Sequence, residues 1–98
     1  PKNFRHILMN NEVHESVGGQ ETAAKDLDLS AIVEAVGASK IFKAETPTEL
    51  KENIPRFISC VGPSFLEIKI CPGSREDLGR PTIKPIDNKE TFMKFLKK

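Results

Sequence analysis

The sequence contains no tryptophan and no tyrosine, and only two cysteines, Cys60 and Cys71. Two cysteines are too few for a disulfide framework, and their separation does not match a metal site, so we expect a reduced, cytoplasmic setting. A dominant charge is also lacking, because 15 basic and 14 acidic residues leave a formal net charge of +1. This balance gives no basis for binding nucleic acid or a membrane surface. No apolar run reaches membrane-spanning length, and no signal-peptide pattern is present.

The composition is otherwise that of an ordinary globular protein, with 38% hydrophobic and 30% charged residues. A chain of 98 residues is one domain or part of one, and it buries a smaller fraction of its surface than a larger domain does. The sequence begins at Pro1 and enters an apolar segment within a few residues. We therefore expect a fragment of a longer protein.

An apolar strand is predicted from Phe4 to Met9, with apolar residues on both faces, as in a sheet covered on both sides. This strand runs directly into Asn10 and Asn11. Ligands of open parallel sheets sit beyond the carboxyl ends of strands, so both asparagines stand at a binding position. An asparagine carbonyl is a neutral oxygen ligand of the kind that Mg²⁺ accepts. The alternative is that the pair only ends the strand and opens a loop.

A polar loop follows from Glu12 to Thr22 and contains Gly18 and Gly19. Glycine lets the backbone turn and approach a ligand where a Cβ would not fit. The next helix signal is reached only at Asp28, so this loop is expected to carry the candidate site.

Apolar periodicity and capping residues predict the remaining elements. In chain order these are a helix from Asp28 to Gly37, a strand from Ala38 to Glu45, a helix capped by Thr46 and Glu49, a strand from Ser64 to Ile70, and a helix opened by Asp87 and Glu90. This alternation predicts the α/β class, as a three-layer parallel sheet with flanking helices and right-handed crossovers. The strands are too few for a complete doubly wound domain, so the fold is expected to be incomplete.

The apolar stripes of the predicted helices are expected to form the core. In the last strand, Leu66 and Ile68 alternate with Glu67 and Lys69, which predicts one wetter face and a place near a sheet edge. Pro55 lies inside the second predicted helix and is expected to kink that helix or end it early.

Two stretches of the sequence carry a family resemblance. One runs from Phe4 to Asn11 and continues as His14 to Gln20, and the other is the tail from Gly73 to Thr82. Together they resemble the carboxyl-terminal half of the pyrophosphate-binding domain of thiamine diphosphate-dependent enzymes, and within these the phosphonopyruvate decarboxylases. The resemblance covers nearly the whole chain. It implies that residues 1–98 are the carboxyl-terminal portion of that domain.

The resemblance also implies a set of site residues. The Asn11 side chain and the Val13 backbone carbonyl would coordinate Mg²⁺, together with an upstream aspartate and the diphosphate oxygens. The residues implied to bind the cofactor are Asn10, Asn11, Val13, Ser16, Gly18, Gly19 and Gln20. For Ser16 and Gln20, hydrogen bonding within the loop is the alternative.

His14 is the candidate catalytic residue, because histidine carries protons near neutral pH, and a surface loop histidine is the alternative. Glu12 stands where the family usually has a small residue, and it adds negative charge near the diphosphate. Arg75 and Arg80 are suited to contact a phosphonate, or to pair with an acidic group of another domain or subunit.

By the same resemblance, the parent enzyme would decarboxylate 3-phosphonopyruvate to phosphonoacetaldehyde, with thiamine diphosphate accepting the electrons of the broken bond. Its partners would be a small 2-oxo acid, the missing amino-terminal domains and further copies of itself in a homo-oligomer. The isolated chain is expected to be inactive, because the glutamate that activates the cofactor lies on another domain. The alternatives are a sulfopyruvate or other 2-oxo acid decarboxylase, a synthase with the same cofactor, or a non-catalytic α/β interaction module.

Overall fold

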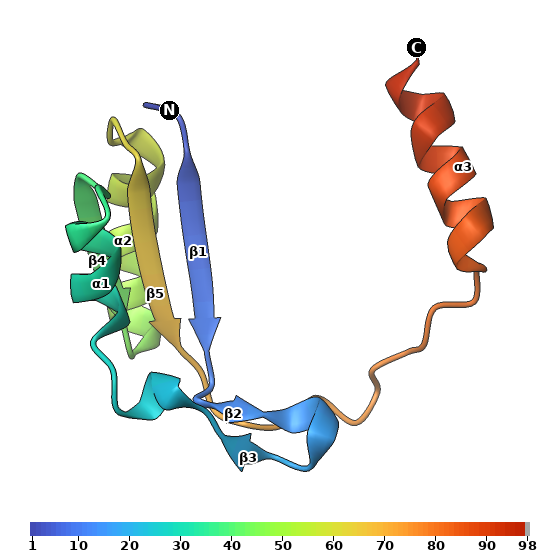
Figure 1. Ribbon diagram of the computed structural model, residues 1–98, viewed down its shortest axis with the longest axis horizontal. Helices are drawn as coiled ribbons and strands as arrows, with labels where there is room; N and C mark the ends of the chain where they lie inside the picture. The colour runs from blue at the N-terminus through green and yellow to red at the C-terminus, as the bar shows by residue number, and fades with distance from the viewer. Residues whose placement is uncertain (98) are drawn as a thin grey trace.

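The computed structural model of the chain describes residues 1–97 (Figure 1). Its strands are β1 (Arg5–Asn10), β2 (Val13–His14), β3 (Gln20–Glu21), β4 (Lys40–Ala44) and β5 (Ser64–Lys69). Its helices are α1 (Leu29–Ala35), α2 (Pro47–Ser59) and α3 (Pro85–Leu96), with short 3-10 turns η1 (Glu15–Val17) and η2 (Ala23–Lys25). Among residues 1–97, no helix has both the length and the apolar character needed to cross a membrane.

The strand order of the main sheet is β1-β5-β4, and both pairings are parallel. Ser64 at the start of β5 pairs with β1 on one side and with β4 on the other, so β5 is the central strand. Phe65 and Leu66 are accordingly 1% and 0% exposed. The prediction that this strand lies near a sheet edge is wrong. Glu67, which the sequence assigned to a wetter face, is buried. Its burial is possible because polar side chains of neighbouring elements donate hydrogen bonds to its carboxylate.

Helices α1 and α2 cover opposite faces of the sheet. Ser30 of α1 contacts Glu67, whereas Phe57 of α2 packs edge-to-face on Phe42 of β4, with ring centroids 5.9 Å apart. Phe42 pairs with Leu66, the neighbour of Glu67, and successive side chains of a strand point to opposite faces. The layered α/β fold with a parallel sheet is therefore confirmed.

The capping box that opens α2 is also confirmed. The Thr46 hydroxyl accepts the Glu49 N–H at 3.2 Å, and the Glu49 carboxylate accepts the Thr46 N–H at 3.1 Å. The helix continues through Pro55 to Ser59, so Pro55 does not end it early, and the alternative of a kink stays a prediction. Phe57 lies two residues after the proline and is 3% exposed. The free energy gained by burying it offsets the cost of the backbone hydrogen bond that proline cannot make.

The expectation that all apolar stripes form the core is wrong for α3, which stands apart from the sheet at the end of an extended segment (Figure 1). Its Phe92 and Phe95 are 59% and 69% exposed. Cover of the sheet is also incomplete at β1, where Ile7 and Met9 are more than half exposed. Burial requires a partner surface, and within residues 1–97 no helix covers this part of β1 or packs against α3.

Candidate functional site

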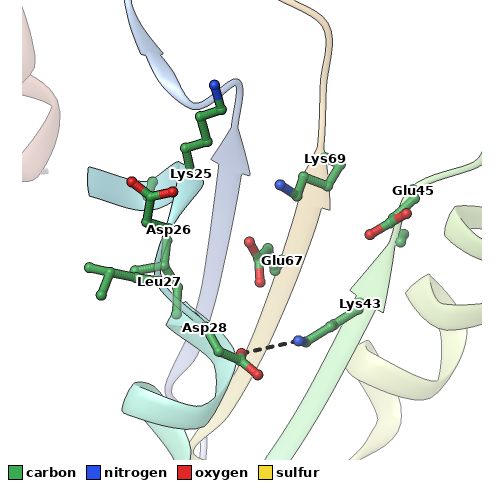
Figure 2. Close-up of a pocket in the computed structure, with 11 residues that line it drawn as sticks. Lys25, Asp26, Leu27, Asp28, Lys43, Glu45, Glu67 and Lys69 are labelled. Atoms are coloured by element: carbon green, nitrogen blue, oxygen red, sulfur yellow. Dashed lines mark hydrogen bonds and ion pairs between the residues drawn. The ribbon is translucent and has the colours of Figure 1, made fainter. Parts of the chain in front are cut away.

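A pocket of about 290 Å³ opens at the carboxyl ends of β4 and β5 (Figure 2). Residues 24–29, from η2 to the start of α1, form one wall, and Lys43, Glu67 and Lys69 lie opposite. Lys43 Nζ lies 3.1 Å from Asp28 Oδ1. The Ala31 N–H, and after it Lys43, holds the pKa of the Asp28 carboxyl below its ordinary value. The pocket is thus lined by paired charges of both signs, which suit a polar ligand better than an apolar one.

The asparagine pair forms a double turn beside this pocket. Asn10 ends β1 and is 5% exposed, and its Oδ1 accepts the Glu12 N–H at 3.0 Å. Asn11 Oδ1 in turn accepts the Val13 N–H at 3.2 Å. Each side chain therefore bonds the backbone two residues further on, which is the usual way that asparagine stabilises a turn. The structure places both residues at the carboxyl end of a parallel strand, as the sequence predicted.

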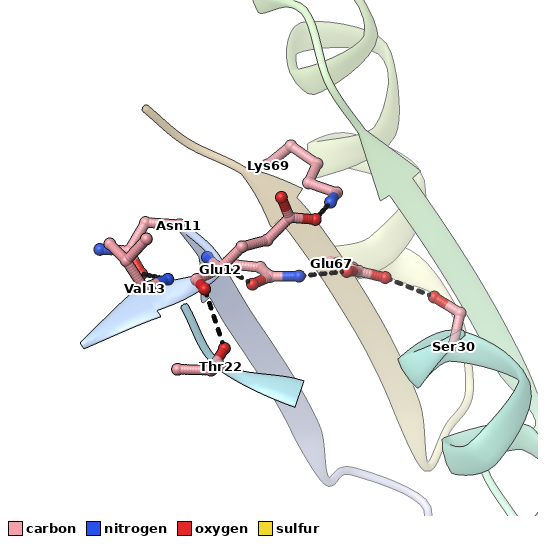
Figure 3. Close-up of polar contacts among 8 residues, drawn as sticks. Asn11, Glu12, Val13, Thr22, Ser30, Glu67 and Lys69 are labelled. Atoms are coloured by element: carbon pink, nitrogen blue, oxygen red, sulfur yellow. Dashed lines mark hydrogen bonds and ion pairs between the residues drawn. The ribbon is translucent and has the colours of Figure 1, made fainter. Parts of the chain in front are cut away.

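Glu12 lies between these turns in the left-handed region, with φ of +61°. This conformation is unfavourable for a residue with a Cβ. Its carbonyl accepts two hydrogen bonds from Thr22, one from the N–H at 2.8 Å and one from the hydroxyl at 3.0 Å. Its carboxylate forms an ion pair with Lys69 of β5 (Figure 3). Contacts to two separate elements thus hold the strained residue in place.

Glu67 connects the turn to the interior of the sheet. It is 7% exposed, and its two carboxylate oxygens accept hydrogen bonds from Asn10 Nδ2 and Ser30 Oγ, each at 2.9 Å (Figure 3). A buried carboxylate is tolerated only when such partners replace water. Glu67 therefore joins β1, β5 and α1 at the base of the asparagine turn.

The loop beyond the turn folds back as the β2–β3 hairpin. Gly18 and Gly19 have φ of +100° and +74°, which confirms that the turn needs glycine there. The hairpin brings the predicted cofactor-binding residues of this loop together. His14 is exposed, and its Nδ1 lies 3.3 Å from Ser16 Oγ, while the Gln20 side chain lies beside Gly18. The Ser16–His14 contact is a local hydrogen bond of the kind that the sequence left open as an alternative, and the catalytic role of His14 stays a prediction.

The donor set of this turn fits Mg²⁺. Within residues 1–97, no cluster of three or more histidine, cysteine, aspartate or glutamate side chains is arranged to hold a metal, so any site must draw on other oxygens. The Thr22 N–H donates to the Glu12 carbonyl, which makes Val13–Glu21 a non-hydrogen-bonded pair of the hairpin. The Val13 carbonyl is therefore not used by β3. It and Asn11 Oδ1 are two neutral oxygens of the kind that Mg²⁺ accepts.

Sequence reasoning missed the residues that support this turn, namely Thr22, Ser30, Glu67 and Lys69. A signal was present for Glu67, because a carboxylate in a strand with apolar neighbours either faces water or has a buried partner. Nothing local to the sequence distinguishes these cases.

The arginine tail makes few contacts with the site in the described structure. The Gly73 N–H donates to the Glu15 carboxylate, which also accepts Asn11 Nδ2 at 3.1 Å. Arg75 forms an exposed pair with Asp77 at 3.2 Å, so its proposed contact with an anionic ligand stays a prediction. Cys60 is half-buried and Cys71 exposed, and both are free thiols.

Taken together, the fold and the site define part of an α/β protein with an oxygen-rich turn at the carboxyl edge of a parallel sheet, where ligands of such sheets bind. No protein-family model matches the chain.

Two curated proteins are similar to the chain over nearly all of its length. It is 31% identical to the phosphonopyruvate decarboxylase of Streptomyces viridochromogenes over 96 residues, or 98% of the chain. It is 32% identical to the phosphonopyruvate decarboxylase of Streptomyces hygroscopicus over 95 residues, or 97% of the chain. The chain spans 24% of each relative, about a quarter of its length. It is thus homologous to part of phosphonopyruvate decarboxylase.

Proposed function

We propose that this chain is the carboxyl-terminal portion of the thiamine diphosphate-binding domain of a Mg²⁺-dependent decarboxylase that acts on 3-phosphonopyruvate. The observation that carries the proposal is the asparagine turn at the end of β1, which presents Asn11 Oδ1 and leaves the Val13 carbonyl outside the hairpin ladder. The similarity to two proteins named phosphonopyruvate decarboxylase supports the substrate.

In this proposal the chain contributes part of a cofactor site. Asn11 and the Val13 carbonyl hold Mg²⁺, which needs near-octahedral oxygen coordination and receives its other ligands from the diphosphate and from residues outside this chain. Gly18 and Gly19 keep the loop surface free of side chains, and a Cβ added at Gly19 would meet nothing within 4 Å. Thiamine diphosphate, when bound, supplies the electron sink for loss of carbon dioxide.

The ion pair between Lys69 and Glu12 reduces the effect of placing a negative charge near the diphosphate. Lys69 Nζ lies against the Glu12 carboxylate and compensates its charge locally. His14 is exposed on β2, with Nδ1 beside the Ser16 hydroxyl, and would hold or deliver a proton to a substrate.

The test is decarboxylation by the full-length protein with phosphonopyruvate, sulfopyruvate and pyruvate, in wild type and in Asn11→Ala. We expect preference for phosphonopyruvate, and in the variant at least about a tenfold rise in the Mg²⁺ concentration for half-maximal activity, since disturbing the surroundings of a metal already costs this much. Asn88→Ala, on α3 and away from the turn, is the matched control and should behave as wild type.

Each other outcome points to a different conclusion. Equal Mg²⁺ dependence in Asn11→Ala would remove Asn11 from the site. Preference for sulfopyruvate or pyruvate would keep the cofactor and overturn the substrate. Absence of thiamine diphosphate binding by the full-length protein would favour a non-catalytic interaction module. The isolated chain should show no turnover, because it carries only part of the metal ligands, and measurable turnover would contradict this division of the site.

A further inference from the structure

Two alternate residues of β5 contact the two neighbours of Asn11. Glu67 accepts the hydrogen bond of Asn10 Nδ2 at 2.9 Å, and Lys69 pairs with the Glu12 carboxylate (Figure 3). Within residues 1–97, the Asn11 side chain hydrogen-bonds only to nearby groups, the Val13 N–H and Glu15. The side chains of β5 therefore reach the proposed metal ligand through the residues on either side of it.

Stability alone does not explain a carboxylate at position 67. The site lies on the central strand and is 7% exposed, so an apolar residue would fill it without the cost of removing a charge from water. Both oxygens of Glu67 are instead used to accept hydrogen bonds from two different elements, β1 and α1. This arrangement restricts the Asn10 side chain to one orientation, with Nδ2 toward Glu67 and Oδ1 toward the Glu12 N–H.

We infer that Glu67 and Lys69 are positioning residues, which fix the direction of the Asn11 side chain by holding Asn10 and Glu12 against β5. The expected effect on Mg²⁺ binding rests on the proposed role of Asn11 as a metal ligand, whereas the expected effect on the orientation of the Asn11 side chain does not. The backbone also contributes, because the Ile70 N–H donates to the Asn10 carbonyl at 3.0 Å, but that bond leaves the orientation of the side chains open.

Amide hydrogen exchange of the 98-residue chain, followed by NMR, tests this directly. The Val13 N–H is bonded to Asn11 Oδ1, so its protection reports whether the Asn11 side chain keeps its place. The Leu66 amide on the central strand serves as the reference for global stability. In Glu67→Leu, we expect Val13 exchange to rise at least about tenfold relative to Leu66, the size of one lost hydrogen bond to a charged group. In Lys69→Met, we expect a rise of about two- to fivefold, the size of a partly exposed ion pair.

Glu67→Gln is the conservative rescue. Its amide oxygen can still accept from Asn10 and its NH₂ group can donate to the Ser30 hydroxyl, so Val13 protection should stay near that of wild type. The matched controls are Glu45→Leu and Lys43→Met, which remove a carboxylate and an ammonium from the same pocket without touching the asparagine turn. Both controls should leave Val13 exchange unchanged.

Unchanged Val13 exchange in both Glu67→Leu and Lys69→Met would overturn the inference, and so would equal loss of protection in Glu67→Leu and Glu67→Gln. If Glu67→Leu does not fold, the result for Lys69→Met alone tests the inference. The Lys69 side chain is 37% exposed, so its removal leaves the core intact.

A second measurement separates this inference from the proposed function. In the full-length protein, Lys69→Met should raise the Mg²⁺ concentration for half-maximal activity at least about threefold while kcat at saturating Mg²⁺ stays unchanged, because orientation of a ligand affects binding of the metal. If the protein decarboxylates none of the substrates tested, the proposed function fails. The exchange experiment on the chain would still decide the positioning role.

Discussion

The left-handed conformation of Glu12 allows a quantitative test of what holds the asparagine turn. Glu12 has φ of +61°, and its carboxylate pairs with Lys69. A residue with a Cβ costs about 1–2 kcal/mol in this region. An ion pair whose side chains are 30% and 37% exposed contributes much less than a buried one, and roughly 0.2–1 kcal/mol is typical of exposed pairs.

Two substitutions at this position separate the two effects. Glu12→Ala loses the ion pair and keeps the strain, so we expect it to lower the free energy of unfolding by about 0.2–1 kcal/mol. Glu12→Gly loses the same pair but removes the strain, at a cost of about 0.5–1 kcal/mol for the greater freedom of glycine in the unfolded chain. The glycine variant should therefore be more stable than the alanine variant by roughly 0.5–1 kcal/mol.

Urea denaturation followed by far-UV circular dichroism measures both values. In a Lys69→Met background the alanine effect should disappear, because the partner of the carboxylate is gone. Gly19→Ala is the reverse control, since Gly19 has φ of +74° and open space around it, and it should destabilise by about 1 kcal/mol through the backbone alone. An alanine variant at least as stable as the glycine variant would refute the reasoning.

Three further predictions concern the core and the α2 cap. Phe57→Ala should destabilise the chain by about 3–5 kcal/mol, because Phe57 is 3% exposed. Ile58→Ala should cost far less, because Ile58 is 59% exposed. The urea denaturation midpoints of the two variants measure this difference. Thr46→Ala should cost about 1 kcal/mol, measured in the same way. The Glu45 and Thr46 N–H groups hold the pKa of the Glu49 carboxyl below its ordinary value. A lowered pKa stabilises the folded state above the unfolded-state pKa, so the stability difference between wild type and Glu49→Gln should vanish as the pH falls through the folded-state pKa.

Specific results would contradict these predictions. Similar losses in Phe57→Ala and Ile58→Ala would mean that the packing between α2 and the sheet is not the core of this chain. A difference between wild type and Glu49→Gln that grows on acidification would reverse the sign expected from a lowered pKa.

Local signals in the sequence predicted the elements well. Thr46 and Glu49 predicted the start of α2, and both reciprocal hydrogen bonds of the capping box are present. Gly18 and Gly19 predicted the turn of the site loop, and both have positive φ. These features depend on residues a few positions apart, so the sequence contains all the information that they need. The asparagine pair was placed at the end of β1 for the same reason.

The order of the strands required the tertiary structure. An alternation of apolar and charged residues is the same for an edge strand with one wet face and for a central strand whose charged groups have buried partners. Glu67 has such partners in Asn10 and Ser30, which are far away in the sequence. The exposed stripe of α3 is the converse case, because amphipathic spacing predicts a helix but does not say what covers it.

The main strands, the helices and the asparagine turn could thus be predicted from the sequence, since they depend on backbone preferences and neighbouring side chains, whereas the β2–β3 hairpin was predicted only as a loop. The central position of β5, the burial of Glu67 and the contact of Lys69 with Glu12 could be learned only from the folded chain. The physical reason is that a buried polar group is stable only with a partner, and here each partner comes from a different element of the chain.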